Sequence, residues 1–303
     1  MLKRTLFLLL VSVCVSAYPK GAVSVFITAG QSNTDGRIYN KFLPEYIKKN
    51  KYQHTYWCFN SGKYSMNGKF EPFWPRIEMK GSGRWAYDAV TYYWLDQSMG
   101  EDYYVIKESL GGTAIDTTCL SRYKMYWSAS PEFLNSTTAT DQGGKSLLKA
   151  LCGNIDRAID ETLSKLKGGF EFKAFLWHQG ESDLKAQGRY YDNLKAVIAY
   201  LRQHLVSKTG NKKYAKLPVL LGGISHKSRG YSKGVEDAQK RLQDEDPNIY
   251  LVTVNQTNMQ EDNIHFDAAG GELLGKKMYN QLVKLKLAGK KAKCIQVHEN
   301  KAK

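Results

Sequence analysis

The sequence of 303 residues contains no apolar run of the ~18 residues that a membrane-spanning helix needs. It has no internal repeat and no low-complexity linker, so nothing in its composition divides it into separate domains. It has no C-x-x-C or H-x-x-x-H spacing of the kind that binds zinc, and no basic segment interleaved with aromatic residues. These absences predict no membrane span, no metal site and no nucleic-acid partner.

What is present is the composition of an ordinary globular protein. Hydrophobic residues make up 42% of the chain and charged residues 24%, which argues against a disordered or collagen-like chain. The length suits one α/β domain or two small domains with a large core. The formal net charge is +15, and residues 284–303 contribute to it with seven lysines against one glutamate. We expect residues 288–303 to form a solvated basic tail.

The N-terminus is predicted to be a secretory signal peptide. Residues 1–17 start with two basic residues, continue with an apolar centre over residues 6–15 and end in a small-residue cleavage site at Ala17. The chain is therefore expected to be secreted or periplasmic after cleavage near Ala17. A lipoprotein anchored through Cys14 is the alternative.

Four cysteines remain after the predicted signal: Cys58, Cys119, Cys152 and Cys294. An even number in an oxidising compartment is compatible with disulfides, and four cysteines allow three pairings. Free, buried thiols are equally compatible with the sequence.

Short apolar runs alternate with helical patterns along residues 18–287, which we expect to form one domain. Strands are predicted at residues 23–29, 103–107, 173–177, 218–224 and 249–254. Helices are predicted at about 85–97, 146–165, 188–206, 235–243 and 268–286. Within each predicted strand the apolar residues are continuous rather than alternating, as in strands that are buried on both faces. Such strands alternating with helices predict an α/β fold with a parallel sheet of about five strands. The segments 37–81 and 113–145 are interpreted as excursions from this domain.

Polar motifs follow four of the predicted strands. They are G-Q-S-N at residues 30–33, E-S-L-G-G-T at 108–113, W-H-Q-G-E-S-D at 177–183 and D-N-I-H at 262–265. Because parallel strands end at one edge of the sheet, these loops are expected to converge there.

The converging residues have the chemistry of a serine hydrolase. Ser32 is a nucleophile once a base removes its proton, and His265 is the candidate base. Asp262, three residues earlier, can orient the imidazole. The N–H groups of Ser32 and Gly112 and the side-chain amide of Gln179 are candidate oxyanion donors.

This order of motifs resembles the SGNH hydrolase superfamily, and within it the carbohydrate acetylesterases of the sialate O-acetylesterase and acetylxylan esterase (family six) type. The resemblance extends over about residues 22–285, and the H-Q-G-E block is its most specific part. It implies a three-layer, flavodoxin-like fold, Ser32 as nucleophile, His265 as base and no cofactor. The third member of the triad is Asp262, with Glu181 as the alternative.

One segment departs from the pattern of the family. Residues 81–87 read G-S-G-R-W-A-Y where relatives carry a Gly-Pro-rich segment, so Arg84 and Trp85 are candidates for an altered substrate pocket. Asn33 and His178 are further candidate substrate contacts.

The sequence therefore predicts a secreted esterase that removes acetyl groups from carbohydrates of the sialic acid or xylan type. Two other functions are considered. One is a glycoside hydrolase that uses Glu181 and Asp183 as paired carboxylates, and the other is a non-catalytic sugar-binding module. The acetylated sugar and the oligomeric state are left open.

Overall fold

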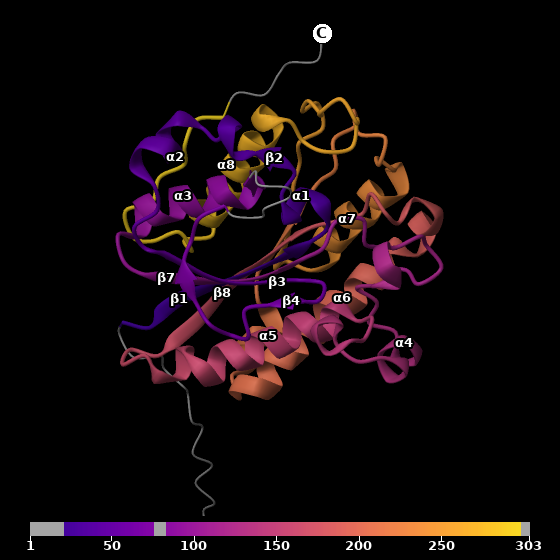
Figure 1. Ribbon diagram of the computed structural model, residues 1–303, viewed down its shortest axis with the longest axis horizontal. Coiled ribbons are helices and arrows are strands. Elements are labelled where there is room, and N and C mark those ends of the chain that lie inside the picture. The colour runs from indigo at the N-terminus through magenta and orange to yellow at the C-terminus, as the bar shows by residue number, and fades with distance from the viewer. Residues whose placement is uncertain (1–20, 76–82, 298–303) are drawn as a thin grey trace, which may run out of the picture.

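A mostly parallel β-sheet runs through the centre of the molecule, with helices on both faces (Figure 1). The computed structural model describes residues 21–75 and 83–297. The strand order in the sheet is β10-β9-β8-β1-β7-β3-β4, and β5 pairs with β3. The strands are β1 (Val23–Gly30), β3 (Thr55–Ser61), β4 (Tyr64–Ser65), β5 (Glu71–Pro72), β7 (Tyr103–Ser109), β8 (Phe170–His178), β9 (Val219–Gly222) and β10 (Ile249–Val252).

All five predicted strands are present, as β1, β7, β8, β9 and β10, and they pair in parallel. Numbered among themselves, they lie in the order 2-1-3-4-5 of a doubly wound, flavodoxin-like sheet. The predicted fold class is confirmed. In this order β1 and β8 flank the point where the strand order reverses. Folds of this kind bind their ligands at the carboxyl ends of the strands at that point.

The prediction for residues 37–81 was incomplete, because part of this segment belongs to the central sheet. Strand β3 pairs in parallel with β7 and makes a sixth parallel strand. The short strands β4 and β5 pair antiparallel with β3 and extend this edge. A separate two-stranded sheet joins β2 (Ile38–Tyr39) to β6 (Arg84–Trp85).

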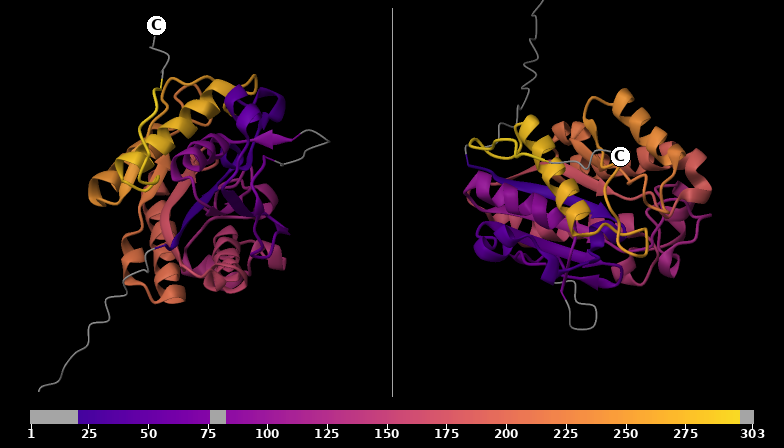
Figure 2. Two further views of the ribbon diagram at one scale, coloured as in Figure 1. Left: turned by 90° about the vertical axis from the view of Figure 1, so that its left-hand side faces the viewer. Right: turned by 90° about the horizontal axis from the view of Figure 1, so that it is seen from above.

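The helices form two layers around the sheet. The long helices are α3 (Tyr87–Met99), α5 (Leu147–Glu161), α6 (Tyr190–Thr209), α7 (Lys233–Glu245) and α8 (Ala268–Lys284), and the shorter ones α1 (Ser32–Asp35), α2 (Glu45–Asn50) and α4 (Pro131–Ser136). Helices α3 and α8 pack on one face and α5, α6 and α7 on the other, each against its own hydrophobic cluster (Figures 1 and 2). Successive residues of β1 alternate between the clusters: Val25 and Ile27 face one and Phe26 the other.

Helices α3 and α8 approach closely, and glycine permits the approach. A Cβ on Gly275 would lie 2.3 Å from the carbonyl oxygen of Tyr87. The Thr91 hydroxyl donates to the carbonyl oxygen of Gly275 over 3.0 Å, which fixes the two helices in register. This contact fixes the middle of α8, the helix that follows the loop carrying His265.

Residues 113–145 form an excursion as predicted, made of loops, α4 and short 3₁₀ turns. The first part of the predicted tail is packed rather than solvated. Ser98 donates to the carbonyl oxygen of Ala288 over 2.7 Å, and the Asn280 amide forms two 2.8 Å hydrogen bonds with the backbone of Ile295. The predicted signal peptide, including Cys14, lies outside the described residues.

The four cysteines of the described chain are all free; Cys58, Cys119 and Cys152 are buried and Cys294 is exposed. Over residues 21–75 and 83–297, no helix has both the length and the apolar character required to cross a membrane.

Candidate active site

Ser32 lies at the carboxyl end of β1, where the chain turns sharply into α1. Gly30 makes this turn possible: its φ is +153°, and a Cβ there would lie 2.1 Å from the carbonyl oxygen of His178. The turn is fixed because the Gln31 N–H and the Thr34 hydroxyl both donate to that same carbonyl oxygen. Ser32 therefore sits between the ends of β1 and β8.

The loop after β7 lies against Ser32. A Cβ on Gly111 would be 3.2 Å from the Cβ of Ser32 and 2.0 Å from Nη2 of Arg37, so a side chain at position 111 would collide with its neighbours. Gly112 is exposed and has a φ of +74°, a conformation that favours glycine. Among the described residues the N–H groups of Ser32 and Gly112 donate no hydrogen bond, which leaves both free to bind a ligand oxygen.

His265 is held by Asp262 within the loop between β10 and α8. The Asp262 Oδ2 atom lies 2.5 Å from Nδ1 of His265, and Oδ1 accepts from the N–H groups of Ile264 and His265. Burial alone would raise the pKa of Asp262, but these hydrogen bonds and the adjacent imidazole lower it below its usual value. The carboxylate therefore remains charged and fixes the orientation of the ring.

Asn33 ties the Ser32 turn to the His265 loop. Its Nδ2 donates to the carbonyl oxygen of Ile264 over 3.2 Å, and its Oδ1 accepts from the N–H of Phe266 over 3.0 Å. The residue after Ser32 is thus bonded to both neighbours of His265. The structure contains no hydrogen bond between the Ser32 hydroxyl and His265; such bonds commonly tighten only when substrate is bound.

Glu181 contacts Asn33 and not His265. Its Oε1 accepts from Nδ2 of Asn33 over 2.9 Å and lies 3.3 Å from Nε2 of His178. Burial raises the pKa of Glu181, but the charge of His178 and the hydrogen bonds outweigh it, so that the pKa is lowered. In this geometry Glu181 positions Asn33, and Asp262 is the carboxylate that contacts the histidine.

Gln179 does not have the free donor that an oxyanion site needs. Its Nε2 faces three acceptors: Oδ2 of Asp183 at 2.6 Å, the carbonyl oxygen of Thr113 at 3.1 Å and Oε1 of Gln31 at 3.1 Å. Because an amide has only two N–H hydrogens, none remains for a ligand. Gln179 instead ties the Gly111–Gly112 loop to β8 through Thr113.

The four predicted substrate contacts are positioned for other tasks. His178 is fully buried, and Nδ1 lies 3.0 Å from the carbonyl oxygen of Gly222. Trp85 is only 1% exposed and packs in the core. The guanidinium of Arg84 stacks on Tyr39, 3.7 Å from the centre of its ring. Asn33 forms the hydrogen bonds to Ile264 and Phe266 described above. The prediction that these side chains line the substrate pocket is therefore wrong for His178 and Trp85, because solvent cannot reach them.

The paired carboxylates of the glycosidase alternative are also inaccessible. Asp183 is fully buried and accepts from the N–H groups of Ile115 and Asp116 and from Gln179. Burial outweighs these bonds and raises the pKa of Asp183. With Glu181 buried as well, the pair cannot flank a glycosidic bond. Among the described residues no three His, Cys, Asp or Glu side chains come together in a metal-binding arrangement.

Arg37 belongs to the site and was not predicted. It forms an ion pair with Asp35 at 2.7 Å, and its guanidinium packs against Gly111 beside Ser32. Both side chains of the pair are nearly buried. A single arginine after a G-Q-S-N turn gives no sequence signal that its guanidinium lies beside Ser32. That placement depends on how close the ends of β1 and β7 lie to each other.

Part of the chain matches a known protein family. Residues 136–284 match a model of the family described as carbohydrate esterase, sialic acid-specific acetylesterase. The matched segment contains Gln179, Glu181, Asp262 and His265, whereas Ser32 and Gly112 precede it. A search of curated protein sequences gives no match.

Solved structures share the fold. A protein from Arabidopsis thaliana is 20% identical with a TM-score of 0.60, and the alignment covers 87% of this chain and 98% of that one. NanS is 12% identical with a TM-score of 0.59, covering 89% and 98%. A carbohydrate acetylesterase from Xanthomonas citri is 17% identical with a TM-score of 0.51, covering 84% of this chain and 55% of that one.

The fold and the family match together indicate an α/β carbohydrate esterase, as the motifs predicted. More particularly, residues 136–284 match the carbohydrate esterase domain described as a sialic acid-specific acetylesterase, which indicates a carboxylic ester hydrolase.

Proposed function

We propose that this carbohydrate acetylesterase is a secreted serine esterase that works through a Ser32–His265–Asp262 triad and an acetyl-enzyme intermediate. The observation that carries the proposal is the geometry of His265. Its ring is hydrogen-bonded to Asp262 at 2.5 Å, and Asn33, the residue that follows Ser32, is hydrogen-bonded to both chain neighbours of His265. The loop that carries the proposed base and carboxylate is thus hydrogen-bonded to the residue next to the proposed nucleophile.

The first half of the reaction acylates the enzyme. The Ser32 hydroxyl attacks the acetyl carbonyl carbon and its proton passes to Nε2 of His265, because Nδ1 is occupied by Asp262. The N–H groups of Ser32 and Gly112 stabilise the negative oxygen of the tetrahedral intermediate. The bond from the acetyl carbon to the sugar oxygen then breaks, and His265 returns the proton to that oxygen.

The second half releases acetate. A water molecule gives a proton to His265 and attacks the acetyl carbon, and the ester bond to Ser32 breaks as His265 returns the proton to the serine oxygen. Ser32, His265 and the two N–H groups are restored, and no further reactant is consumed.

Acetate release from defined glycans tests this function. The mature protein should release acetate from acetylated xylan or from O-acetylated sialoglycans, and Ser32→Ala should release none above background. A parallel assay for new reducing ends separates deacetylation from glycoside cleavage. New reducing ends would favour a glycosidase, and sugar binding without any turnover would favour a binding module.

Secretion is part of the proposal because of the N-terminal sequence. Residues 1–17 have the basic start, apolar centre and small-residue end of a signal peptide. Cleavage near Ala17 would deliver the enzyme to the periplasm or the medium, where acetylated glycans are accessible.

A further inference from the structure

A cavity of about 830 Å³ opens beside the Gly111–Gly112 loop. Its floor consists of Gly62, Leu110 and Met125, from the ends of β3 and β7 and from the loop after β7. The N–H of Arg122 donates to the carbonyl oxygen of Gly112 over 2.8 Å, so the cavity wall and the proposed oxyanion site share one loop.

Four basic side chains line this cavity: Lys63, Arg122, Lys124 and Lys145. No Asp or Glu lines it, and none of the four forms an ion pair with a carboxylate in the described chain. We call this set of residues, with the cavity they surround, the basic pocket.

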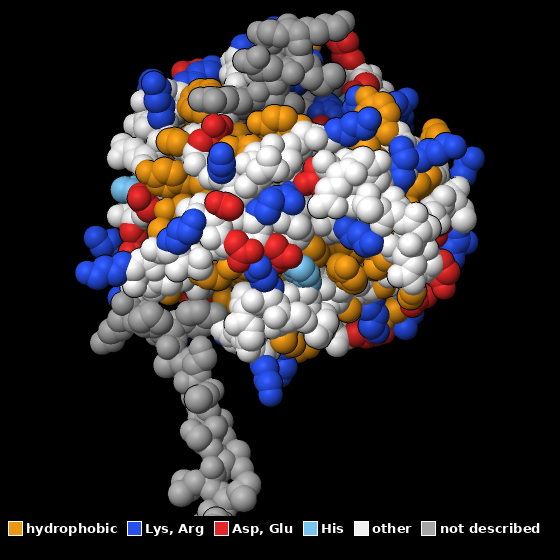
Figure 3. Space-filling model, turned by 60° about the horizontal axis from the view of Figure 1, so that its bottom comes forward, with side chains coloured by type: hydrophobic (Ala, Val, Ile, Leu, Met, Phe, Trp, Pro, Cys, Tyr) orange, Lys and Arg blue, Asp and Glu red, His pale blue; other side chains and the backbone are white. Residues whose placement is uncertain are grey.

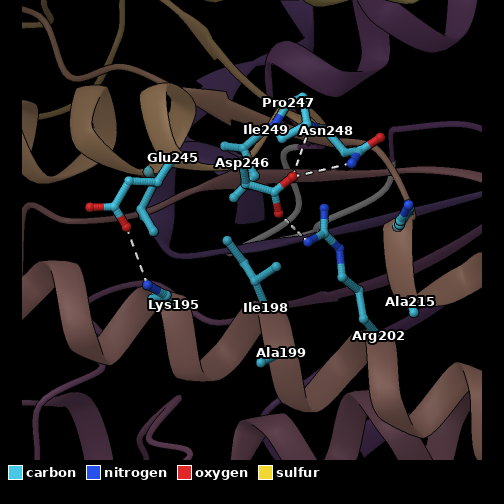
Figure 4. Close-up of a pocket in the computed structure, with 12 residues that line it drawn as sticks. Lys195, Ile198, Ala199, Arg202, Ala215, Glu245, Asp246, Pro247, Asn248 and Ile249 are labelled. Carbon is cyan, nitrogen blue, oxygen red and sulfur yellow. Dashed lines mark hydrogen bonds and ion pairs between the residues drawn. The ribbon is translucent and has the colours of Figure 1, made fainter.

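Several basic side chains elsewhere in the described chain are paired with carboxylates. In the pocket of Figure 4, Lys195 is paired with Glu245 at 3.2 Å and Arg202 with Asp246 at 2.5 Å. On the face shown in Figure 3, basic and acidic side chains lie interspersed. Among the described residues that line the basic pocket, no acidic side chain offsets the positive charge, which raises the local concentration of anions.

Two tyrosine rings stand at the rim of the basic pocket. Tyr64 is 58% exposed and Tyr123 is 62% exposed, both high for large hydrophobic side chains. The guanidinium of Arg122 lies 5.0 Å from the centre of the Tyr123 ring. Exposed tyrosine rings provide apolar faces with a polar tip, which suits contact with the apolar face of a sugar.

The backbone that presents Tyr123 and Lys124 is strained. Their φ angles are +56° and +54°, values that are uncommon for residues other than glycine. The turn is held by Lys124 N–H donating to Ser121 and by Lys145 Nζ donating to the carbonyl oxygen of Tyr123 over 3.1 Å. Strain of this kind is concentrated at ligand-binding sites.

The basic pocket is close enough to Ser32 to contact the same substrate. It lies over the ends of β7 and β3, and β7 is the immediate neighbour of β1. Adjacent strands are about 4.8 Å apart, a distance comparable to one sugar ring. A glycan whose acetyl group reaches Ser32 can therefore place a neighbouring group in the basic pocket.

We propose that the basic pocket binds the acid group of an anionic sugar, a carboxylate or a sulfate, and thereby selects acidic acetylated glycans over neutral ones. This inference rests on the proposed esterase function, because it describes a subsite of the same substrate. The cations supply long-range attraction and charge-assisted hydrogen bonds, and the tyrosine rings pack on the sugar.

The test neutralises two of the cations. Lys63 and Lys124 are exposed, and their side chains form no hydrogen bond in the described structure, so Lys63→Gln/Lys124→Gln should fold normally. The matched control is Lys165→Gln/Lys212→Gln, which removes the same charge from exposed positions preceding β8 and β9. Substrates are an O-acetylated oligosaccharide carrying a glucuronate, one carrying a sulfate, and a neutral O-acetylated xylo-oligosaccharide of equal length.

We expect the pocket variant to lose roughly tenfold in kcat/KM on an anionic substrate, mainly through KM, and to be unchanged on the neutral one. The loss should disappear in about 1 M salt, where the screening length is about 3 Å. The two anionic substrates show whether carboxylate or sulfate is preferred. An equal loss on all substrates, or an equal loss in the control variant, would overturn the proposal.

A binding measurement keeps this result separate from the esterase activity. Calorimetry with the deacetylated glucuronate and sulfate oligosaccharides needs no turnover. Binding by wild type that weakens roughly tenfold in the pocket variant supports the pocket even if no ester is cleaved. If the enzyme turns over the neutral ester but neither binds nor prefers the acidic sugars, the proposed esterase function stands. The proposal that the basic pocket binds acidic sugars is then refuted.

Discussion

The side chain of Asn33 holds His265 from both sides. Its amide donates to the carbonyl oxygen of Ile264 and accepts from the N–H of Phe266, while the same Nδ2 contacts the buried Glu181. The loops after β1, β8 and β10 are thus joined at one amide. Their relative position depends on this residue more than on any direct contact between nucleophile and base.

Replacing Asn33 should therefore separate the loops that carry Ser32 and His265. In Asn33→Ala three hydrogen bonds are lost and Glu181 loses its amide donor, so we expect a fall of roughly 10²-fold in kcat/KM from misplacement of His265. Steady-state kinetics on an acetyl ester measure this. Asn280→Ala is the matched control, because Asn280 also forms two backbone hydrogen bonds but far from the site. Similar kinetic losses in both variants would mean that Asn33 acts only on stability.

The two carboxylates near the site should respond differently to neutralisation. Asp262→Asn removes the one carboxylate that contacts His265 among the described residues and favours the wrong tautomer of the ring, so turnover at neutral pH should fall by roughly 10⁴-fold. Glu181→Gln keeps an oxygen that can accept from Asn33 and should cost less than about tenfold, since one hydrogen bond contributes about 1 kcal/mol. Both variants are assayed on one acetyl ester. If Glu181→Gln is the more damaging by tenfold or more, Glu181 orients the histidine.

Glu108 should make the protein less stable as pH rises. It is fully buried at the end of β7, and burial raises its pKa well above the usual value. The unfolded chain releases this proton near pH ~4.3, whereas the folded chain keeps it to higher pH. The free energy of unfolding therefore falls as pH rises from ~4.3 towards the folded-state pKa.

Glu108→Gln removes this titration. The variant should be more stable than wild type near pH ~7, and the difference should shrink near pH ~4, where both unfolded chains are neutral at this position. Urea denaturation at the two pH values measures it, with the exposed Glu132→Gln as control. A variant less stable than wild type at neutral pH would show that the Glu108 carboxylate is ionised and stabilising in the fold.

The predicted signal peptide should be absent from the mature enzyme. Protein recovered from the producing cell should begin near residue 18, as measured by intact mass or N-terminal sequencing. A chain that starts at Met1 in the cytosol would refute secretion. A chain that starts at Cys14 and carries added lipid mass would identify a lipoprotein.

The strands that carry the site were predictable from the sequence because they are buried on both faces. The apolar runs that became β1, β7 and β8 are nearly continuous, and each ends at a motif. Strand β3 was missed because T-Y-W-C-F-N-S lies among polar residues in a long connecting segment. Only its pairing with β7 shows that it belongs to the sheet.

The site was predictable as far as residue type and strand position determine it. Ser32, Gly112 and His265 follow strands whose ends must meet, so their convergence follows from topology. The structural roles of Asn33 and Gln179 could not be predicted from the sequence, because both roles depend on hydrogen bonds to groups that are distant in sequence. The burial of His178 and Trp85 depends likewise on how the helices cover the sheet.

Replacement of Ser32 tests the serine mechanism most directly. Ser32→Ala and Ser109→Ala are compared on one acetyl ester; Ser109 is a buried serine at the end of the neighbouring strand. Circular dichroism verifies that both variants fold. We predict a loss in kcat/KM on the order of 10⁴-fold or more for Ser32→Ala and a far smaller one for Ser109→Ala. A folded Ser32→Ala protein with activity within about tenfold of wild type would contradict the assignment of Ser32 as the nucleophile.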